Sequence, residues 1–252
     1  MKIYFFEEFP NASNLSKLEL IDFPTKLFLA DYSIEGYKQY ERELKKKYKN
    51  LEEVIWWPVV NVNEGYWLSP WTKRGALIRV ISKLKDKKTP ILWDAEFPKN
   101  RKLILTESFR HFKNKKIIKS FLTKYKGNVY TAEYFAENKF FKSVLFSICL
   151  SFDPKTYNNK VVKMVYSSMM PFSAEGFIRS EIKFYKEEYG DNFMVGLGVL
   201  ATGINGNERL ISAENLERDL NICKEIGVEE VVIYRLGGLN KEYLKVIKKF
   251  TK

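Results

Sequence analysis

The sequence is poor in the residues that metal sites and disulfide frameworks require. It contains one histidine, His111, and two cysteines, Cys149 and Cys223, which lie far apart in apparently helical segments. A single histidine argues against the histidine-based metal sites of isomerases and phosphodiesterases, and we expect His111 on the surface. The cysteines predict buried free thiols in a reducing compartment. The sequence therefore predicts no metal and no cofactor.

The chain also lacks a hydrophobic run long enough to cross a membrane. Its longest apolar stretch, "SVLFSICLSF" at 143–152, is about half the length that a spanning helix needs. The first residues, "MKIYFFEEFP", carry Glu7 and Glu8 where a signal peptide would be apolar. We therefore expect an N-terminal strand, a cytoplasmic location and no membrane partner.

Negative charge is in deficit, since 43 Lys and Arg face 31 Asp and Glu, for a net charge of +12. The lysines gather in helical patches at 41–50, 82–88 and 111–128. Interspersed acids favour solvated helix surfaces over a nucleic-acid site, so we expect no nucleic-acid partner. The single glutamine, Gln39, and the abundance of Lys, Glu and Ile resemble the composition of thermophile proteins.

What the sequence does contain is a regular alternation of strand-like and helix-like segments. The expected strands are 2–9, 26–33, 54–62, 90–97, 128–135, 161–168, 193–201 and 230–237. The expected helices are 33–50, 72–88, 173–190, 212–227 and 240–250, and those at 173 and 212 begin with a Ser-Ala-Glu cap. This rhythm predicts a single-domain (β/α)8 TIM barrel over residues 1–252. A doubly wound sheet is the alternative, but "FFEEFPNAS" lacks its glycine-rich first turn.

Acidic residues follow five of the eight expected strands, where barrels build their active sites. The polar strand-end residues are Glu7, Glu8, Asp31, Glu64, Asp94, Glu96, Glu133, Tyr166, Ser167, Thr202, Tyr234 and Arg235. An acidic mouth would repel phosphates and suit a neutral polyol, a sugar or a hydrated cation. The competing interpretation is that these acids cap the helices that follow the strands, and for Asp31 the sequence favours neither interpretation over the other.

Aromatic residues accompany these acids. The stretch "NEGYWLSPW" after the third strand brings Tyr66, Trp67 and Trp71 together. Aromatic faces beside carboxylates suit carbohydrate, because the sugar C–H face stacks while its hydroxyls form hydrogen bonds. The same rings could instead pack a loop onto the barrel rim.

Two short motifs carry a family resemblance. "DAEFP" at 94–98 resembles the end of the fourth-strand signature of the chitinase-type glycoside hydrolases (family 18), and Met164-Val165-Tyr166 resembles their sixth-strand motif. The resemblance implies Glu96 as general acid, Asp94 as the group that orients a substrate acetamido group, and Tyr166 as a hydrogen-bond donor to it. Thr89 and Leu92 stand where the family has two further aspartates.

The acid pair also makes chemical sense without the resemblance. Asp94 and Glu96 are two positions apart on a strand and so project from one face. A neighbouring carboxylate in a partly dry site raises the pKa of Glu96 and keeps it protonated. Glu7, Glu133 or the loop residue Glu208 could supply a further carboxylate. The echo of "AEFP" at 95–98 by "EEFP" at 7–10 could reflect a half-barrel repeat.

The sequence therefore predicts a carbohydrate-active barrel whose substrate is a small molecule or an oligosaccharide. The expected catalytic residues are Glu96, Asp94 and Tyr166. The expected substrate-binding residues are Glu7, Asp31, Glu64, Tyr66, Trp67, Trp71, Glu133, Tyr234 and Arg235.

The sequence is compatible with four other functions. A non-catalytic sugar-binding barrel would use the same site. A phosphosugar enzyme would bind phosphate at Gly237 and Gly238, with Arg235 assisting. A divalent ion could be held by Asp94, Glu96 and Glu133. A Schiff-base enzyme would use Lys163, although Lys163 and Tyr166 should face opposite ways.

Overall fold

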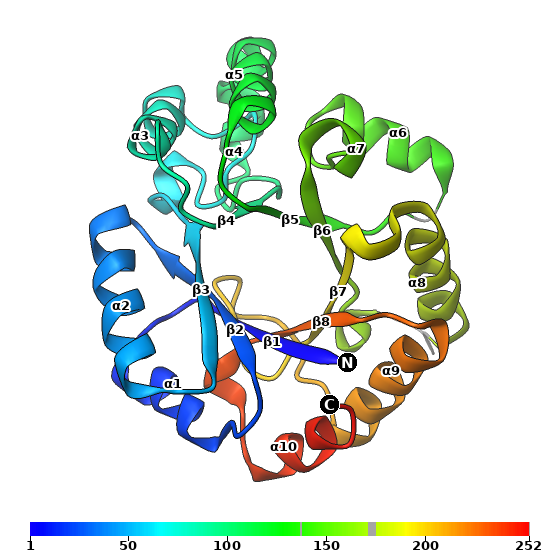
Figure 1. The fold of residues 1–252 in the computed structure, drawn as a ribbon. Helices are drawn as coiled ribbons and strands as arrows, with labels where there is room; N and C mark the ends of the chain where they lie inside the picture. The colour runs from blue at the N-terminus through cyan, green and yellow to red at the C-terminus, as the bar shows by residue number, and fades with distance from the viewer. Residues whose placement is uncertain (137, 171–174, 252) are drawn as a thin grey trace.

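The computed structural model describes residues 1–136, 138–170 and 175–251, which form a closed barrel of eight strands (Figure 1). The strands are β1 (Lys2–Glu7), β2 (Thr25–Asp31), β3 (Leu51–Pro58), β4 (Ile91–Asp94), β5 (Val129–Tyr134), β6 (Asn159–Met164), β7 (Phe193–Gly198) and β8 (Glu230–Tyr234). Each strand pairs in parallel with the next along the chain, and β8 pairs with β1. The predicted TIM barrel is confirmed.

Helices surround this barrel, as Figure 1 shows. They are α1 (Ala12–Leu15), α2 (Ile34–Lys47), α3 (Arg74–Leu84), α4 (Lys102–Thr106), α5 (His111–Lys124), α6 (Lys139–Ser147), α7 (Pro154–Tyr157), α8 (Glu175–Tyr189), α9 (Ala213–Ile226) and α10 (Lys241–Lys248). The expected cap of α9 is confirmed, because the Ser212 side chain accepts from Asn215 N–H. The cap expected at Ser173 lies outside the described residues.

Strand alternation divides the buried residues into two cores. One set of side chains fills the barrel interior and includes Tyr4, Phe6, Phe28, Ile55, Trp57, Leu92, Tyr130, Val162, Met194 and Val232. The opposite faces of the same strands pack against the helices and include Ile3, Phe5, Leu27, Trp56, Trp93, Val161, Val195 and Ile233. Because successive side chains on a strand point to opposite faces, a shift of one residue changes which core a side chain enters.

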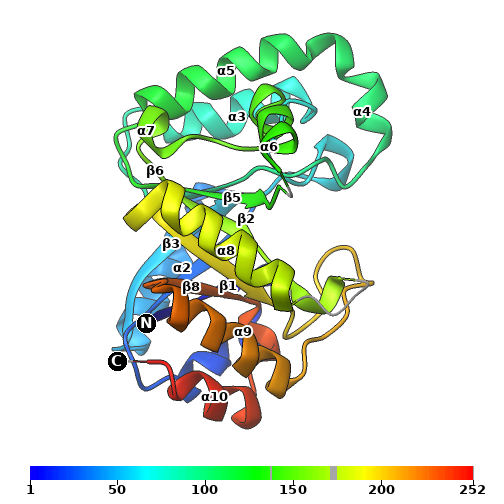
Figure 2. The same cartoon turned by 90° about the vertical axis from the view of Figure 1, so that its right-hand side faces the viewer.

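The two ends of the barrel differ in chemistry. At the N-terminal end the Tyr4 hydroxyl donates to Glu230 (2.9 Å), and Lys160 forms an ion pair with Glu230. Lys26 pairs there with Glu53 at 2.9 Å. In Figure 2 both termini lie at one side of the molecule, whereas helix α4 and the loop after β7 extend at the opposite side. That opposite side holds the C-terminal ends of the strands, so any active site of the barrel type belongs there.

Three smaller expectations can be compared with the fold. Both cysteines are free and buried, as expected, but Cys149 lies beyond the end of α6 with φ 56° rather than in a helix. His111 is half-buried, not a free surface residue, because its ring packs on Trp71 at 4.8 Å. In the described part of the chain no helix combines the length and the apolar character that crossing a membrane demands.

Candidate functional site

A cavity of about 440 Å³ opens at the C-terminal end of the barrel. Four carboxyl groups line it, from Glu8, Asp94, Glu96 and Glu208, together with aromatic rings that include Trp57, Trp67, Tyr134, Tyr166 and Tyr234. Among the described residues, its lining includes no lysine, arginine or histidine. The cavity therefore combines acidic groups with stacking surface in a protein of net charge +12.

Strand β4 delivers two of these carboxyl groups. Leu92 faces the barrel interior, so Asp94 and Glu96, two and four positions further along the chain, reach the cavity above it. Asp94 is 1% exposed, and its Oδ1 has no hydrogen-bond partner among the described residues. Burial, followed by repulsion from Glu96 and Glu8, raises the pKa of Asp94 well above its usual value.

Glu96 sits at the wall of the cavity, where Tyr134 from β5 reaches it. The Tyr134 hydroxyl donates to Glu96 Oε2 at 2.9 Å, and Phe97 N–H donates to the same hydroxyl oxygen at 3.3 Å. Burial raises the pKa of Glu96 to about 7, although the Tyr134 hydrogen bond acts in the opposite direction. A carboxyl group with this pKa is part protonated at neutral pH and can donate a proton.

Glu8 is a site residue that the sequence interpretation passed over in favour of Glu7. The Tyr234 hydroxyl forms a hydrogen bond with Glu8 Oε2, and Ile204 N–H donates to the same oxygen at 3.0 Å. Burial raises the pKa of Glu8, while the hydroxyls of Tyr234 and Tyr66 lower it. The echo between "EEFP" and "AEFP" was the available signal, because it aligns Glu8 with Glu96.

Tyr166 and Tyr234 both reach the cavity, as the sequence predicted. Their ring centroids are 5.6 Å apart with the planes tilted by 36°. Burial, followed by the nearby charges of Glu96 and Asp94, raises the pKa of Tyr166 well above its usual value. The Tyr166 hydroxyl therefore stays protonated and can donate a hydrogen bond to a ligand.

The three aromatic residues after β3 take different positions. Trp67 lines the cavity. Tyr66 is buried, packs edge-on against Trp67 at 5.3 Å and interacts with Glu8. Trp71 lies elsewhere, between Phe97 and His111 at 5.2 and 4.8 Å, so it packs the loop as the competing interpretation held. Trp57, which sequence reasoning did not select, joins Trp67 in the lining.

Five of the expected substrate-binding residues, all of them charged, lie outside the cavity lining, and two of these pair with each other. Glu7 accepts hydrogen bonds from Arg235 Nη1 at 3.0 Å and from Gly237 N–H at 2.7 Å. This carboxylate occupies the place where the phosphosugar hypothesis put a phosphate. The placement of Glu7 and Arg235 in the cavity and the phosphate site at Gly237 are therefore wrong.

Asp31 supports Ser33, the N-cap residue of α2, rather than lining the cavity. Its carboxylate accepts from Ser33 N–H at 2.7 Å, and the Ser33 side chain in turn accepts from Gly36 N–H. Glu64 also lies outside the cavity, where it accepts from Asn61 N–H at 3.3 Å and pairs with Arg79 at 2.8 Å. Both acids serve local structure.

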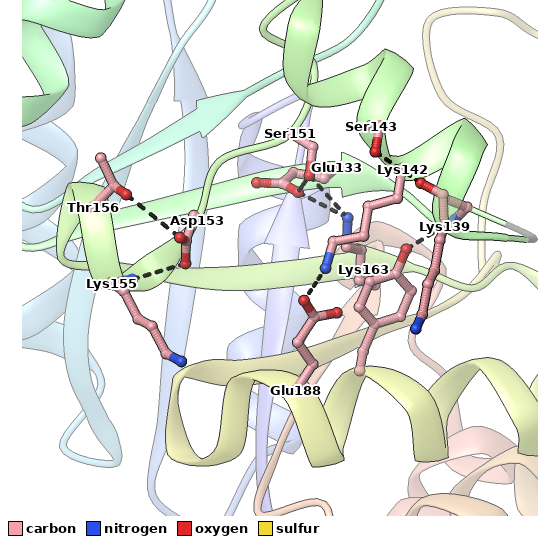
Figure 3. A network of polar contacts seen from close by, with 12 residues as sticks. Glu133, Lys139, Lys142, Ser143, Ser151, Asp153, Lys155, Thr156, Lys163 and Glu188 are labelled. Carbon is pink, nitrogen blue, oxygen red and sulfur yellow. Dashed lines mark hydrogen bonds and ion pairs between the residues drawn. The ribbon is translucent and has the colours of Figure 1, made fainter.

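Glu133 is the fifth of these residues and, unlike its neighbour Ala132, lies on the outer face of β5; Figure 3 shows its surroundings. Its carboxylate pairs with Lys163 at 2.8 Å and accepts from Ser151 Oγ at 2.6 Å, all three residues being buried between the barrel and the helices. A metal held jointly by Asp94, Glu96 and Glu133 is excluded by this orientation. Lys163 cannot form a Schiff base in the cavity for the same reason.

The loop between β7 and α9 contributes the fourth acid, Glu208. Glu208 Oε1 accepts from Asn205 N–H at 3.1 Å, whereas its buried Oε2 has no partner among the described residues. Asn205 also accepts from Lys99 Nζ at 2.8 Å, which ties this loop to the one after β4. In the described ranges no group of three or more His, Cys, Asp or Glu side chains is arranged to hold a metal ion.

Comparisons with known proteins bear on the fold. No protein-family model matches the chain, and no curated protein sequence matches it. Among solved structures it is similar to the PgaB (BpsB) glycoside hydrolase domain of Bordetella bronchiseptica (TM-score 0.59, 12% identity, 100% of this chain and 98% of that one). The likeness is one of fold.

Two further structures have the same architecture. The spore cortex-lytic enzyme SleL of Bacillus cereus gives a TM-score of 0.62 at 11% identity, over 100% of this chain and 74% of that one. A family-18 chitinase of Pseudoalteromonas aurantia gives 0.57 at 9% identity, over 99% of this chain and 100% of that one. The suspected resemblance to barrels of the chitinase type is thus confirmed at the level of fold.

Proposed function

We propose that the protein is a carbohydrate-active barrel that hydrolyses glycosidic bonds, with Glu96 as the general acid. The observation that carries the proposal is the position of Glu96 in the C-terminal cavity, beside Asp94 and with a pKa of about 7. Two of the similar structures are named as a glycoside hydrolase domain and a chitinase, which supports a carbohydrate substrate. The cavity volume of about 440 Å³ falls in the range of small-molecule sites.

Three groups in the cavity, from Glu96, Asp94 and Tyr166, take part in the proposed reaction. The Glu96 carboxyl group donates its proton to the glycosidic oxygen as the C–O bond breaks. Asp94 orients a substrate acetamido group, whose carbonyl oxygen attacks the anomeric carbon and forms a cyclic intermediate. Tyr166 donates a hydrogen bond to that group. The Glu96 carboxylate then removes a proton from the water molecule that opens the intermediate.

The aromatic lining supplies binding energy for the sugar. Trp57, Trp67 and Tyr234 present ring surface to the cavity. The C–H face of a pyranose can stack on such rings while its hydroxyls bond to the carboxylates. This combination favours a neutral sugar over an anionic substrate, since among the described lining residues no lysine, arginine or histidine could pair with a phosphate.

The test is a Glu96→Gln variant assayed on a panel of aryl glycosides that includes N-acetylglucosaminides. Loss of general-acid catalysis should lower kcat by about 10²- to 10⁴-fold. Glu64→Gln is the matched control, because Glu64 lies outside the cavity and should leave kcat unchanged. Equal turnover by the wild type and the Glu96→Gln variant would remove Glu96 as the acid.

A non-catalytic sugar-binding barrel is the second candidate. Leu92 occupies the interior position before Asp94, and Asp94 Oδ1 has no described partner, so no carboxylate from that position supports the pair. Saturable oligosaccharide binding by the wild type, with no product after prolonged incubation, would favour this function. Product formation would exclude it.

A further inference from the structure

Three large apolar side chains are exposed at the corner of the molecule where α4 leads into α5. Leu105, Phe109 and Phe112 are 81%, 71% and 70% exposed. They follow at intervals of four and three residues through α4, the 3₁₀ turn η3 (Ser108–Arg110) and the start of α5. In Figure 2 this segment forms the outer edge of the molecule. We call residues 101–116 the α4–α5 corner.

Leu105, Phe109 and Phe112 do not belong to the hydrophobic core, because the segment that carries them buries a different face. The opposite faces of α4 and α5 are anchored by buried residues, Leu103 at 4% exposure and Ile118 at 0%. Buried Asn114 donates from Nδ2 to Pro70 O at 2.9 Å and to Thr72 O at 3.1 Å. The segment therefore has a fixed inner face and a separate outer apolar face, and such a patch marks an interaction site.

Positive charge surrounds the apolar face. Residues 101–126 contain nine Lys and Arg but a single acid, Glu107, which is buried and pairs with Arg110 at 3.2 Å. The Arg110 guanidinium lies 4.7 Å from the Phe109 ring centroid, and Lys115 Nζ lies 5.6 Å from that of Phe112. Rings and cations thus share one surface, and within residues 101–126 no solvent-exposed acid offsets their charge.

We propose that the α4–α5 corner docks on the surface of an anionic lipid bilayer. Exposed leucine and phenylalanine can enter the boundary between headgroups and acyl chains, while the neighbouring lysines and arginines pair with anionic headgroups. A second copy of this chain is disfavoured as the occupant, because two such surfaces would bring like charges together. A nucleic acid would match the cations but would leave Leu105 without a partner.

Peripheral docking is compatible with the lack of a spanning helix in the described residues, because it needs only surface side chains. It departs from the expectation that the patch at 111–128 is a plain solvated helix surface. Figure 2 places α4 at the same side of the molecule as the loop after β7, which contributes to the cavity lining. Docking there would bring the cavity mouth close to the membrane surface.

The experiment is co-sedimentation of the full chain with vesicles of phosphatidylcholine alone and of phosphatidylcholine with phosphatidylglycerol. We expect binding to the anionic vesicles, weakened by added salt, and little binding to the neutral ones. The triple variant Leu105→Ser/Phe109→Ser/Phe112→Ser should bind the anionic vesicles about tenfold more weakly or worse. The variant Lys113→Gln/Lys116→Gln should lose about fivefold for each charge removed.

Matched controls are available on other exposed surfaces. Tyr32→Ser removes an exposed apolar side chain before α2, and Lys45→Gln/Lys46→Gln removes two exposed charges from α2. Both should bind vesicles like the wild type. Equal binding by the corner variants and these controls, or retention of a protein or nucleic acid at the corner without vesicle binding, would overturn the proposal. Because the readout is binding, the result does not depend on whether the cavity is catalytic.

Discussion

At the scale of single residues, the alternation of side chains along each strand decides which acids reach the cavity: every second residue points inward, and those between them point outward. Glu7 and Glu8 are neighbours in the sequence, yet Glu8 lines the cavity and Glu7 pairs with Arg235 outside the barrel interior. Asp94 and Glu96 face the cavity because they lie on the same strand face as Leu92. Glu133 lies on the opposite face of its strand from Ala132, which lines the cavity. The sequence indicated the strand ends, but it could not show which face points inward where both faces are apolar.

A residue-scale prediction concerns the pH dependence of Glu96. The Tyr134 hydroxyl stabilises the Glu96 carboxylate and so lowers its pKa against the effect of burial. A general acid must be protonated, so activity should fall as pH rises through about 7. Tyr134→Phe removes the donor, raises the pKa of Glu96 and should move the basic limb of the kcat–pH profile to higher pH.

The control for this prediction is Tyr40→Phe, since the Tyr40 hydroxyl bonds to Pro10 O and neither residue lines the cavity. Its profile should match that of the wild type. A basic limb that stays in place in Tyr134→Phe would show that Glu96 does not set it.

At the scale of elements, the loop between β7 and α9 determines how closely the cavity is packed. A Cβ atom added at Gly203 would lie 1.8 Å from the Tyr234 hydroxyl and 2.7 Å from Glu8 Oε2. Only glycine lets the loop backbone approach Tyr234 and Glu8 this closely, and Ile204 N–H can then donate a hydrogen bond to Glu8. The sequence shows the glycines of "ATGING", but their contact with β1 and β8 is a product of the closed barrel.

Gly203→Ala should therefore displace Tyr234 and Glu8 and reduce kcat/KM by up to about 10²-fold, as expected for a shift of about 1 Å in a site. The assay is steady-state kinetics on the best substrate of the panel. Gly75→Ala in α3 is the control, because no atom lies within 4 Å of the added Cβ. That helix substitution should leave kcat/KM unchanged and stabilise the fold by about 0.5–1 kcal/mol. Wild-type kinetics in Gly203→Ala would contradict the assigned role of the loop.

At the scale of the whole molecule, a buried ion pair joins the barrel to its outer layer. Lys163 on β6 contacts Glu133 on β5 at 2.8 Å, Ser151 Oγ at 3.3 Å and Tyr134 O at 3.1 Å, and both ionic side chains are fully buried (Figure 3). Removing one member leaves the other charge uncompensated in a fully buried place. The strand order alone does not reveal this pairing, because it depends on the register of β5 against β6, which sets Glu133 opposite Lys163.

Lys163→Met should destabilise the protein by about 3–5 kcal/mol in urea unfolding. Adding Glu133→Gln should recover a large part of that loss, because the second change removes the unpaired charge. Lys183→Met provides the control, since Lys183 is exposed and its contact with Glu187 is 4.0 Å long; it should change stability by less than about 1 kcal/mol. A loss below about 1 kcal/mol in Lys163→Met would show that the pair is not needed for stability.

The sequence by itself determined the barrel, since the period of apolar residues and the spacing of turns are local properties that eight strand–helix units repeat. It also located the acids of β4 and the tyrosines of β6 and β8, because motif spacing on one strand fixes a shared face. Only the tertiary structure decided that Glu8 and Glu208 also line the cavity. It also decided which expected residues do not line it, namely Glu7, Asp31, Glu64, Glu133, Trp71 and Arg235. The inward face of each strand, the path of each loop and the register between strands depend on closure of the whole barrel, so no single segment encodes them.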